Sequence, residues 1–292
     1  MSSDPLPRLD GDGRYTRPSS SLRFDDFLRS AQAVSQYASR LNCLAFNNKL
    51  LLIGWFIDYL TKQPNIRLVL DAEVPRGMLG CTAKRRVSID GHERSLYLIL
   101  VSARVSHPLL RQFTLAHELG HVLLHGSLLQ PGMLVRRSHH PWTHLDERRQ
   151  SLLEVEANVY ALMSLIPDRV IAEVQSATDL TVGTLQDVLR SLYGYSLDDN
   201  LVFERIMIYD ALRMTAAVDR ASLRIRFDTF CARQHSWAAS GPRSPRQDES
   251  GRRKLPGDLL DRIRDRLEAE EVIPPPGPLD DVAIGGLGLC RK

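Results

Sequence analysis

The sequence predicts an α+β protein in which a small β-sheet packs on a long helix, followed by a helical region and a tail. Strand-like apolar patterns occur at residues 66–70, 86–89 and 96–101. Helical spacing of apolar residues follows over residues 108–125, and again over most of residues 148–234. From residue 236 onward, Gly and Pro together form about a quarter of the chain, a composition typical of low-complexity segments.

The composition argues against nucleic acid and membranes as the main partner. The 292 residues are enough for one large domain or two modest ones. Lys and Arg number 38 against 35 Asp and Glu, and this net charge of +3 is too small to indicate nucleic acid or an anionic membrane as the main partner. A hydrophobic share of 43% is ordinary for a folded protein. We therefore expect a folded protein whose main partner is neither nucleic acid nor a membrane.

The lack of a signal peptide and the spacing of the cysteines predict a cytoplasmic protein. Residues 1–10 lack the apolar core of a signal peptide. The longest apolar run, residues 50–60, contains Asp58 and is shorter than the roughly 20 residues of a membrane span, so we expect a buried helix there. The cysteines lie far apart with no CxxC pair, as is typical of reduced thiols: Cys43, Cys81, Cys231 and Cys290.

Four segments are expected along the chain. Residues 1–20 form a disordered leader, residues 21–170 the first domain, residues 171–235 a helical domain, and residues 236–292 the low-complexity tail. Thr181 and Asp198 are expected to cap helices in the helical domain. Within the tail, residues 258–271 carry an apolar stripe, which predicts either a transient helix in a disordered tail or a helix that docks on a partner.

The segment TLAHELGH at residues 114–121 contains the candidate metal-binding and catalytic residues. Positions four apart on a helix share one face, so His117 and His121 can direct one imidazole nitrogen each at a single ion. Glu118 lies about 100° round the helix, beside the ion, where it can act as a general base. This is the HExxH pattern of zinc sites. A solvated polar stripe is the alternative, and the position directly after a buried strand favours the metal site.

The same helix contains three further signals. Gly120 costs about 1 kcal/mol relative to Ala inside a helix, which predicts the close approach of another segment. We expect Ser106 to cap the start of the helix and Gly126 to end it in the left-handed conformation. His125 is expected to serve this helix end rather than to bind the metal.

A catalytic zinc site requires a third protein ligand. The metzincin spacing is excluded because Ser127 occupies the position that would need His. Cys81 would be the ligand in a deformylase-like scheme, and Glu154 or Glu156 in a scheme that uses the following helix. The two glutamates lie about 200° apart on that helix, so only one of them can face the metal.

The neighbours of the two glutamates favour Glu154. Its side of the helix carries Ala157 and Ala161, which permit close helix packing, and Asn158, which can orient a ligand histidine from outside the coordination shell. Glu156 instead shares its side with larger packing residues, namely Val159, Tyr160 and Met163. We therefore predict His117, His121 and Glu154 as ligands, with Asn158 behind them.

Together, the motifs FTLAHELGH (residues 113–121), EVEANVYA (154–161) and LIP (165–167) resemble the ImmA/IrrE family of zinc metallopeptidases. The resemblance covers roughly residues 60–170 and implies a zincin-like domain with the same three ligands and Glu118 as general base. Tyr160 stands where the family usually has Phe, and Ile166 where it usually has Met. The sequence shows neither the N-terminal DNA-binding domain nor the C-terminal sensor domain of some relatives.

The resemblance also implies a role. Family members are intracellular proteases that cleave a helix-turn-helix repressor, so we expect a zinc-dependent endopeptidase that cuts a DNA-binding repressor and thereby regulates transcription, for example in a stress response. A non-catalytic regulator that occludes a transcription factor is one alternative, although it has no use for Glu118. A zinc amidase with Cys81 as ligand is another.

The sequence also indicates candidates for binding the substrate and for stabilising the oxyanion. An extended substrate is expected to pair with the strand at residues 96–101 if that strand lies at the edge of the sheet. Candidates for stabilising the oxyanion carry no ranking: Tyr160, His107, His139, His140 and His144.

Overall fold

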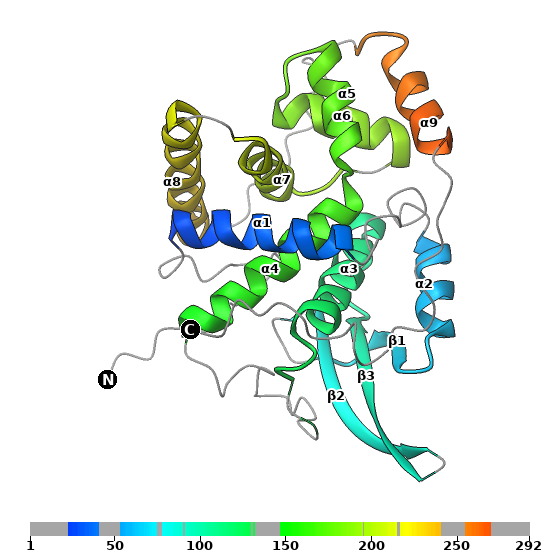
Figure 1. Cartoon of the computed structure of the whole chain (residues 1–292). Coiled ribbons are helices and arrows are strands. Elements are labelled where there is room, and N and C mark those ends of the chain that lie inside the picture. Colours follow the sequence, from blue (N-terminus) through cyan, green and yellow to red (C-terminus); the bar gives the residue numbers. More distant parts are fainter. Residues whose placement is uncertain are drawn as a thin grey trace.

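A computed structural model describes residues 23–40, 53–74, 78–89, 91–129, 131, 147–194, 196–214, 217–240 and 255–269 (Figure 1). It confirms the α+β class. The expected leader at residues 1–20 and most of the expected tail lie outside the described residues. The elements in chain order are α1 (Phe24–Arg40), α2 (Ile53–Lys62), β1 (Ile66–Ala72), β2 (Gly80–Ile89), β3 (His92–Ser102), α3 (Pro108–His125), α4 (Glu147–Leu165), α5 (Asp168–Ala177), α6 (Val182–Tyr193), α7 (Asp199–Arg213), α8 (Ala217–Ser240) and α9 (Leu259–Ala269).

The three strands form one sheet in the order β1-β3-β2. The central strand β3 pairs in parallel with β1 and antiparallel with β2. The expectation that a substrate could pair with residues 96–101 is therefore wrong, because both sides of β3 already bond to neighbouring strands. A continuous apolar run indicates burial, and the central position of β3 is the reason for that burial.

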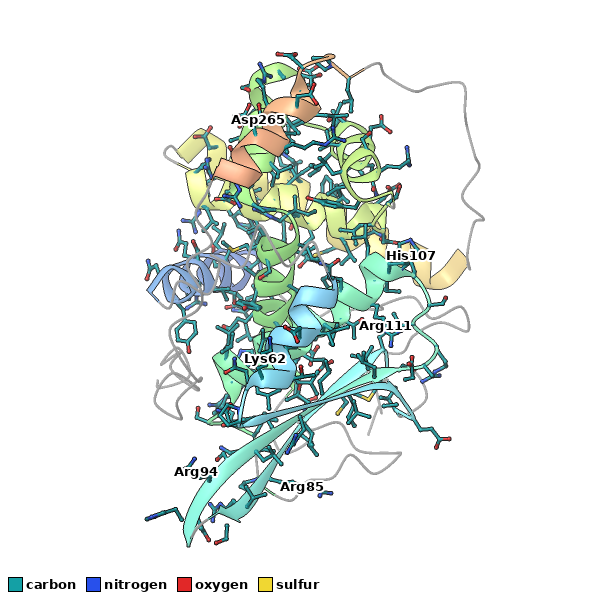
Figure 2. All side chains as sticks on the ribbon, turned by 90° about the vertical axis from the view of Figure 1, so that its right-hand side faces the viewer. Lys62, Arg85, Arg94, His107, Arg111 and Asp265 are labelled. Carbon is teal, nitrogen blue, oxygen red and sulfur yellow. The ribbon has the colours of Figure 1, made fainter. Side chains whose placement is uncertain are left out.

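The sheet turns one face to the helices. Tyr97, Ile99 and Val101 alternate along β3 and are almost fully buried in the common core. The far end of the β2–β3 hairpin projects beyond the helices and carries Arg85 and Arg94 (Figure 2). The part of the sheet that supports α3 is thus the half that contains the end of β3, next to the loop that connects β3 to α3.

The ends of α3 differ from the sequence-based expectation. Its N-cap is His107 rather than Ser106, and the His107 ring accepts a hydrogen bond from the Leu110 N–H at 3.4 Å. Pro108 is the reason, because it holds the residue before it in an extended conformation (φ −74°, ψ 121°) and the helix can begin only after that residue. Gly126 keeps right-handed helical angles, so the expected left-handed ending is also wrong.

Helices α3 and α4 pack closely at Gly120. A Cβ atom on Gly120 would lie 3.2 Å from the Cα atom of Ala157 and 3.2 Å from the Tyr160 ring. The predicted close approach is confirmed, and the partner is the small-residue side of α4. This contact fixes where the acidic residues of α4 lie relative to the histidines of α3.

The end of α4 is tied to the helical region by a buried arginine. Arg205 of α7 is completely buried, and its Nε donates to the Ile166 carbonyl at 2.7 Å. Its guanidinium also pairs with Asp168, the first residue of α5, which accepts a second hydrogen bond from Arg213 at 3.1 Å. Thr181 and Asp198 cap α6 and α7 as predicted.

Helix α9 packs on its own chain. Leu259 and Ile263 are buried, and the helix contacts α5 and α6. Arg262 of α9 also forms an ion pair with Glu173 of α5, with 3.7 Å between the Arg262 Nε and the Glu173 Oε2. The expectation of a transient helix in residues 258–271 is therefore wrong: the helix packs on the helical region through Leu259 and Ile263. None of the helices in the described part of the chain combines the length and the apolarity that crossing a bilayer requires.

Replacing Asp168 by Asn tests the buried arginine pair. Burial alone would raise the pKa of Asp168, but the guanidinium groups of Arg205 and Arg213 outweigh it and hold the pKa below the ordinary value of 3.8. The carboxylate then contributes stability above about pH 4 and loses this contribution as the pH falls through its folded-state pKa. We expect Asp168→Asn to lower the free energy of unfolding at pH 7 by about 1–2 kcal/mol, at the low end for a charged hydrogen bond because the Asp168 side chain is 37% exposed.

Urea unfolding between pH 7 and pH 3 measures this effect. The difference between the wild type and the variant should shrink toward the acid end. Asp261→Asn, which removes an exposed pair with Arg264 on α9, is the control and should change stability by less than about 0.5 kcal/mol. A difference that stays constant down to pH 3 would contradict the ion-pair interpretation.

Candidate metal centre

Three buried side chains converge from α3 and α4. The Nε2 atoms of His117 and His121 lie 3.0 Å apart. The Glu154 carboxylate approaches both, with Oε2 at 3.3 Å from the His117 Nε2 and Oε1 at 3.5 Å from the His121 Nε2. One potential ligand atom from each residue lies within 4.8 Å of the others, and each residue is at most 6% exposed. The structure thus brings together the three residues predicted as ligands.

The chemistry of these donors fits a cation. The Nδ1 of His117 lies 2.8 Å from the Asn158 Oδ1, and since an amide oxygen only accepts, the imidazole donates there from Nδ1. A neutral His117 then has an unprotonated Nε2, which faces the second imidazole and a carboxylate. Buried acceptors that face one another require a positive charge between them. A metal ion bound by His117, His121 and Glu154 would supply that charge.

The pKa values of the cluster also indicate that it requires a positive charge. Burial favours the neutral form of both imidazoles and lowers the pKa of His121 to about 3. Burial acts on His117 too, but the hydrogen bond and negative charge of Glu154 outweigh it and raise the pKa of His117. The two imidazoles in turn hold the pKa of Glu154 well below its usual value, against the effect of burial. Glu154 is therefore ionised and attracts one positive charge to the cluster.

Glu118 lies beside the cluster and is held by the sheet. The hydroxyl of Thr82, on β2, lies 2.7 Å from the Glu118 Oε2 and donates to it. Burial raises the pKa of Glu118 to about 7, although His117 and the Thr82 hydrogen bond act in the opposite direction. Gly80 leaves room for the carboxylate, since a Cβ at this position would lie 2.7 Å from the Glu118 Oε1. A carboxyl group in this setting can accept and release a proton near neutral pH.

Other residues weighed from the sequence lie outside the cluster. Cys81 is buried, and burial together with the charges of Glu118 and Glu154 raises the pKa of its thiol well above 9.0, which disfavours the thiolate that metal binding requires. Glu156 hydrogen-bonds to His125 instead. Tyr160 is fully buried with its ring against Gly120, and the His107 ring caps α3. The remaining oxyanion candidates, His139, His140 and His144, lie outside the described residues.

Sequence reasoning missed Gly80 and Thr82. Their importance comes from the pairing of β2 with β3 and the packing of that edge on α3, which put both residues against Glu118 of the following helix. No motif marks them, because a Thr and a Gly in a strand are common. The available signal was weak: the strand pattern identified from the sequence began at residue 86, whereas β2 begins at Gly80.

Comparison with known proteins identifies part of the chain. Residues 78–197 match a family model for peptidase M78, described as an IrrE N-terminal-like domain. This match covers strands β2 and β3, helix α3 with the two histidines, helix α4 with Glu154, and the helices α5 and α6 that follow. No curated protein and no solved structure gave a significant match.

Adding a methyl group at Gly80 tests the packing around Glu118. A Cβ there would also lie 2.7 Å from the Thr114 Cγ2, so both α3 side chains must move. We expect Gly80→Ala to lower the free energy of unfolding by about 1–3 kcal/mol, the usual cost of overpacking a core. Chemical denaturation measures this change. Gly183→Ala on α6 is the control, because its Cβ would meet nothing closer than 3.8 Å, and it should be neutral or stabilising.

Proposed function

Residues 78–197 match the family model for peptidase M78, an IrrE N-terminal-like domain, and from this premise we propose that the protein is a zinc-dependent endopeptidase. The convergence of His117, His121 and Glu154, with Glu118 beside them, is the observation that carries the proposal. Two imidazoles and one carboxylate are a ligand set of catalytic zinc sites, which keep a fourth position for water or substrate. A purely structural site would gain nothing from a buried carboxyl group next to the ligands.

The protein's own residues divide the work of peptide hydrolysis. A bound zinc ion supplies Lewis-acid chemistry, which makes water more acidic and draws electron density from a carbonyl oxygen. Glu118 takes the proton from the attacking water and then donates it to the amine that leaves. Thr82 keeps the Glu118 carboxylate in place through its 2.7 Å hydrogen bond. Asn158 holds the His117 ring, so that Nε2 faces His121 and Glu154, where the ion would bind.

The edge strand β2 offers a place for an extended substrate. Because β2 is at the edge of the sheet and its first residues lie against Glu118, a peptide lying along those residues, before the point where Pro131 bridges Lys84, would bring its main chain near the general base. For the substrate itself, we propose a DNA-binding repressor of the helix-turn-helix class, a proposal supported by the resemblance of the motifs to ImmA/IrrE peptidases. Cleavage of that repressor would regulate transcription.

Changing Glu118 to Gln should separate catalysis from metal binding. Glu118 is not among the three convergent ligands, so the variant should keep about one zinc per chain. Peptide hydrolysis should fall by at least a hundredfold, because the amide cannot take the proton from water. Metal analysis of the purified variant and a peptide cleavage assay measure the two effects. Full activity in Glu118→Gln would overturn the proposed mechanism.

Glu154→Ala is the contrasting variant. It removes a convergent carboxylate and leaves two imidazoles, so it should lose both zinc and activity. Cys81→Ser should retain zinc, because the thiol lies outside the cluster. Zinc that disappears only when Cys81 is changed would assign the site to the amidase alternative.

Co-expression tests the proposed substrate. A helix-turn-helix repressor encoded next to this protein should be shortened to one discrete product, because cleavage at a single site is what a regulatory protease requires. The product should disappear with a zinc chelator and with Glu118→Gln. General degradation of casein with an intact repressor would contradict the proposed substrate while leaving the peptidase activity in place.

A further inference from the structure

A chain of buried hydrogen bonds leads away from the cluster on the far side of His121. The Nδ1 of His121 lies 3.1 Å from the Nδ1 of His125, one turn later on α3. The Nε2 of His125 lies 2.8 Å from the Glu156 Oε2 on α4. The other carboxylate oxygen of Glu156 accepts a hydrogen bond from Ser30 of α1 at 3.4 Å. None of these residues is more than 6% exposed, so water does not compete for the bonds.

The direction of these bonds follows from the carboxylate. An ionised carboxylate has no proton to give, so His125 must donate to Glu156 from Nε2. A neutral imidazole has one N–H, which makes the His125 Nδ1 an acceptor. His121 must then donate from its own Nδ1, and its Nε2 is left unprotonated. That Nε2 is the atom that faces His117 and Glu154 at 3.0 and 3.5 Å.

We propose that Glu156 and His125 are positioning residues that set the tautomer and ring orientation of His121 for metal binding. The inference rests on the proposed function, because it assigns His121 to the metal. Asn158 performs the same task for His117 through one direct bond. Helix α4 therefore supplies the ligand Glu154 and also the groups that orient both histidines. Partners of this kind typically change metal affinity 10- to 100-fold.

Two pairs of variants test the roles of the two residues. Glu156→Gln keeps the shape but replaces an obligate acceptor with an amide that can also donate, so the His125 tautomer is no longer fixed. We expect the zinc dissociation constant to rise about tenfold. Glu173→Gln, an equally buried glutamate on α5 that pairs with Arg262, is the matched control and should leave it unchanged.

The second pair compares two substitutions of His125. His125→Leu has no donor or acceptor and should raise the zinc dissociation constant about 10- to 100-fold. His125→Gln can accept from His121 and donate to Glu156, so it should restore part of the affinity. Competition with a chromophoric zinc chelator gives the constants, and thermal unfolding of the metal-free variants shows whether each is folded. A role in packing alone predicts the reverse order, with Leu better tolerated than Gln.

The tautomers themselves give a readout that needs no variant and no metal. Nitrogen NMR of the imidazoles in metal-free wild-type protein should show His121 protonated at Nδ1 and His125 protonated at Nε2. His121 protonated only at Nε2 would overturn the proposal, as would unchanged zinc affinity in both Glu156→Gln and His125→Leu. If the wild-type protein bound no zinc, the proposed function would fail, whereas the tautomers would still decide on the hydrogen-bond chain.

Discussion

The contact between Gly120 and Ala157 is the constraint on which the site depends. Without a side chain at Gly120, the backbone of α4 lies against α3, and a Cβ would come within 3.2 Å of the Ala157 Cα. A glycine inside a helix costs about 1 kcal/mol relative to alanine, so the close packing must offset this cost. It also determines the chemistry, because it places Glu154 and Asn158 at His117 and Glu156 at His125. A wider spacing between the helices would break all three contacts.

The same contact between the helices brings together buried carboxylates and imidazoles, and these groups require a positive charge. Ionised groups are costly to bury unless each is paired, and here two carboxylates and three imidazoles lie almost fully buried between two helices. Glu156 is satisfied by His125 and Ser30, but Glu154 faces two imidazole nitrogens whose other nitrogens are already engaged. One cation between them satisfies all three groups. Binding a metal ion would thus add stability to the fold as well as chemistry to the site.

Local spacing explains what the sequence could and could not predict. His117, Glu118 and His121 follow from a four-residue period on one helix, and Glu154 from a choice between two faces of the next. Thr82 and the His125–Glu156 pair could not be found in this way, since they meet residues 36 and 31 positions away in the sequence through the tertiary packing of β2 and α4 on α3. For a related reason, the sequence left open whether β3 is an edge strand or a central strand, and the docking of α9 was misjudged. An apolar pattern shows that a segment is buried, but not what covers it.

The proposed general base and the proposed metal ligands are held by different parts of the fold. Glu118 is adjacent in sequence to His117, yet its carboxylate is fixed by Thr82 and the space at Gly80, both on β2. The ligands depend instead on α4. The contacts that hold Glu118 are separate from the convergent cluster, because neither Thr82 nor Gly80 belongs to it. The sheet therefore does more than support α3: it holds the proposed proton acceptor, Glu118, against the cluster that the two helices build.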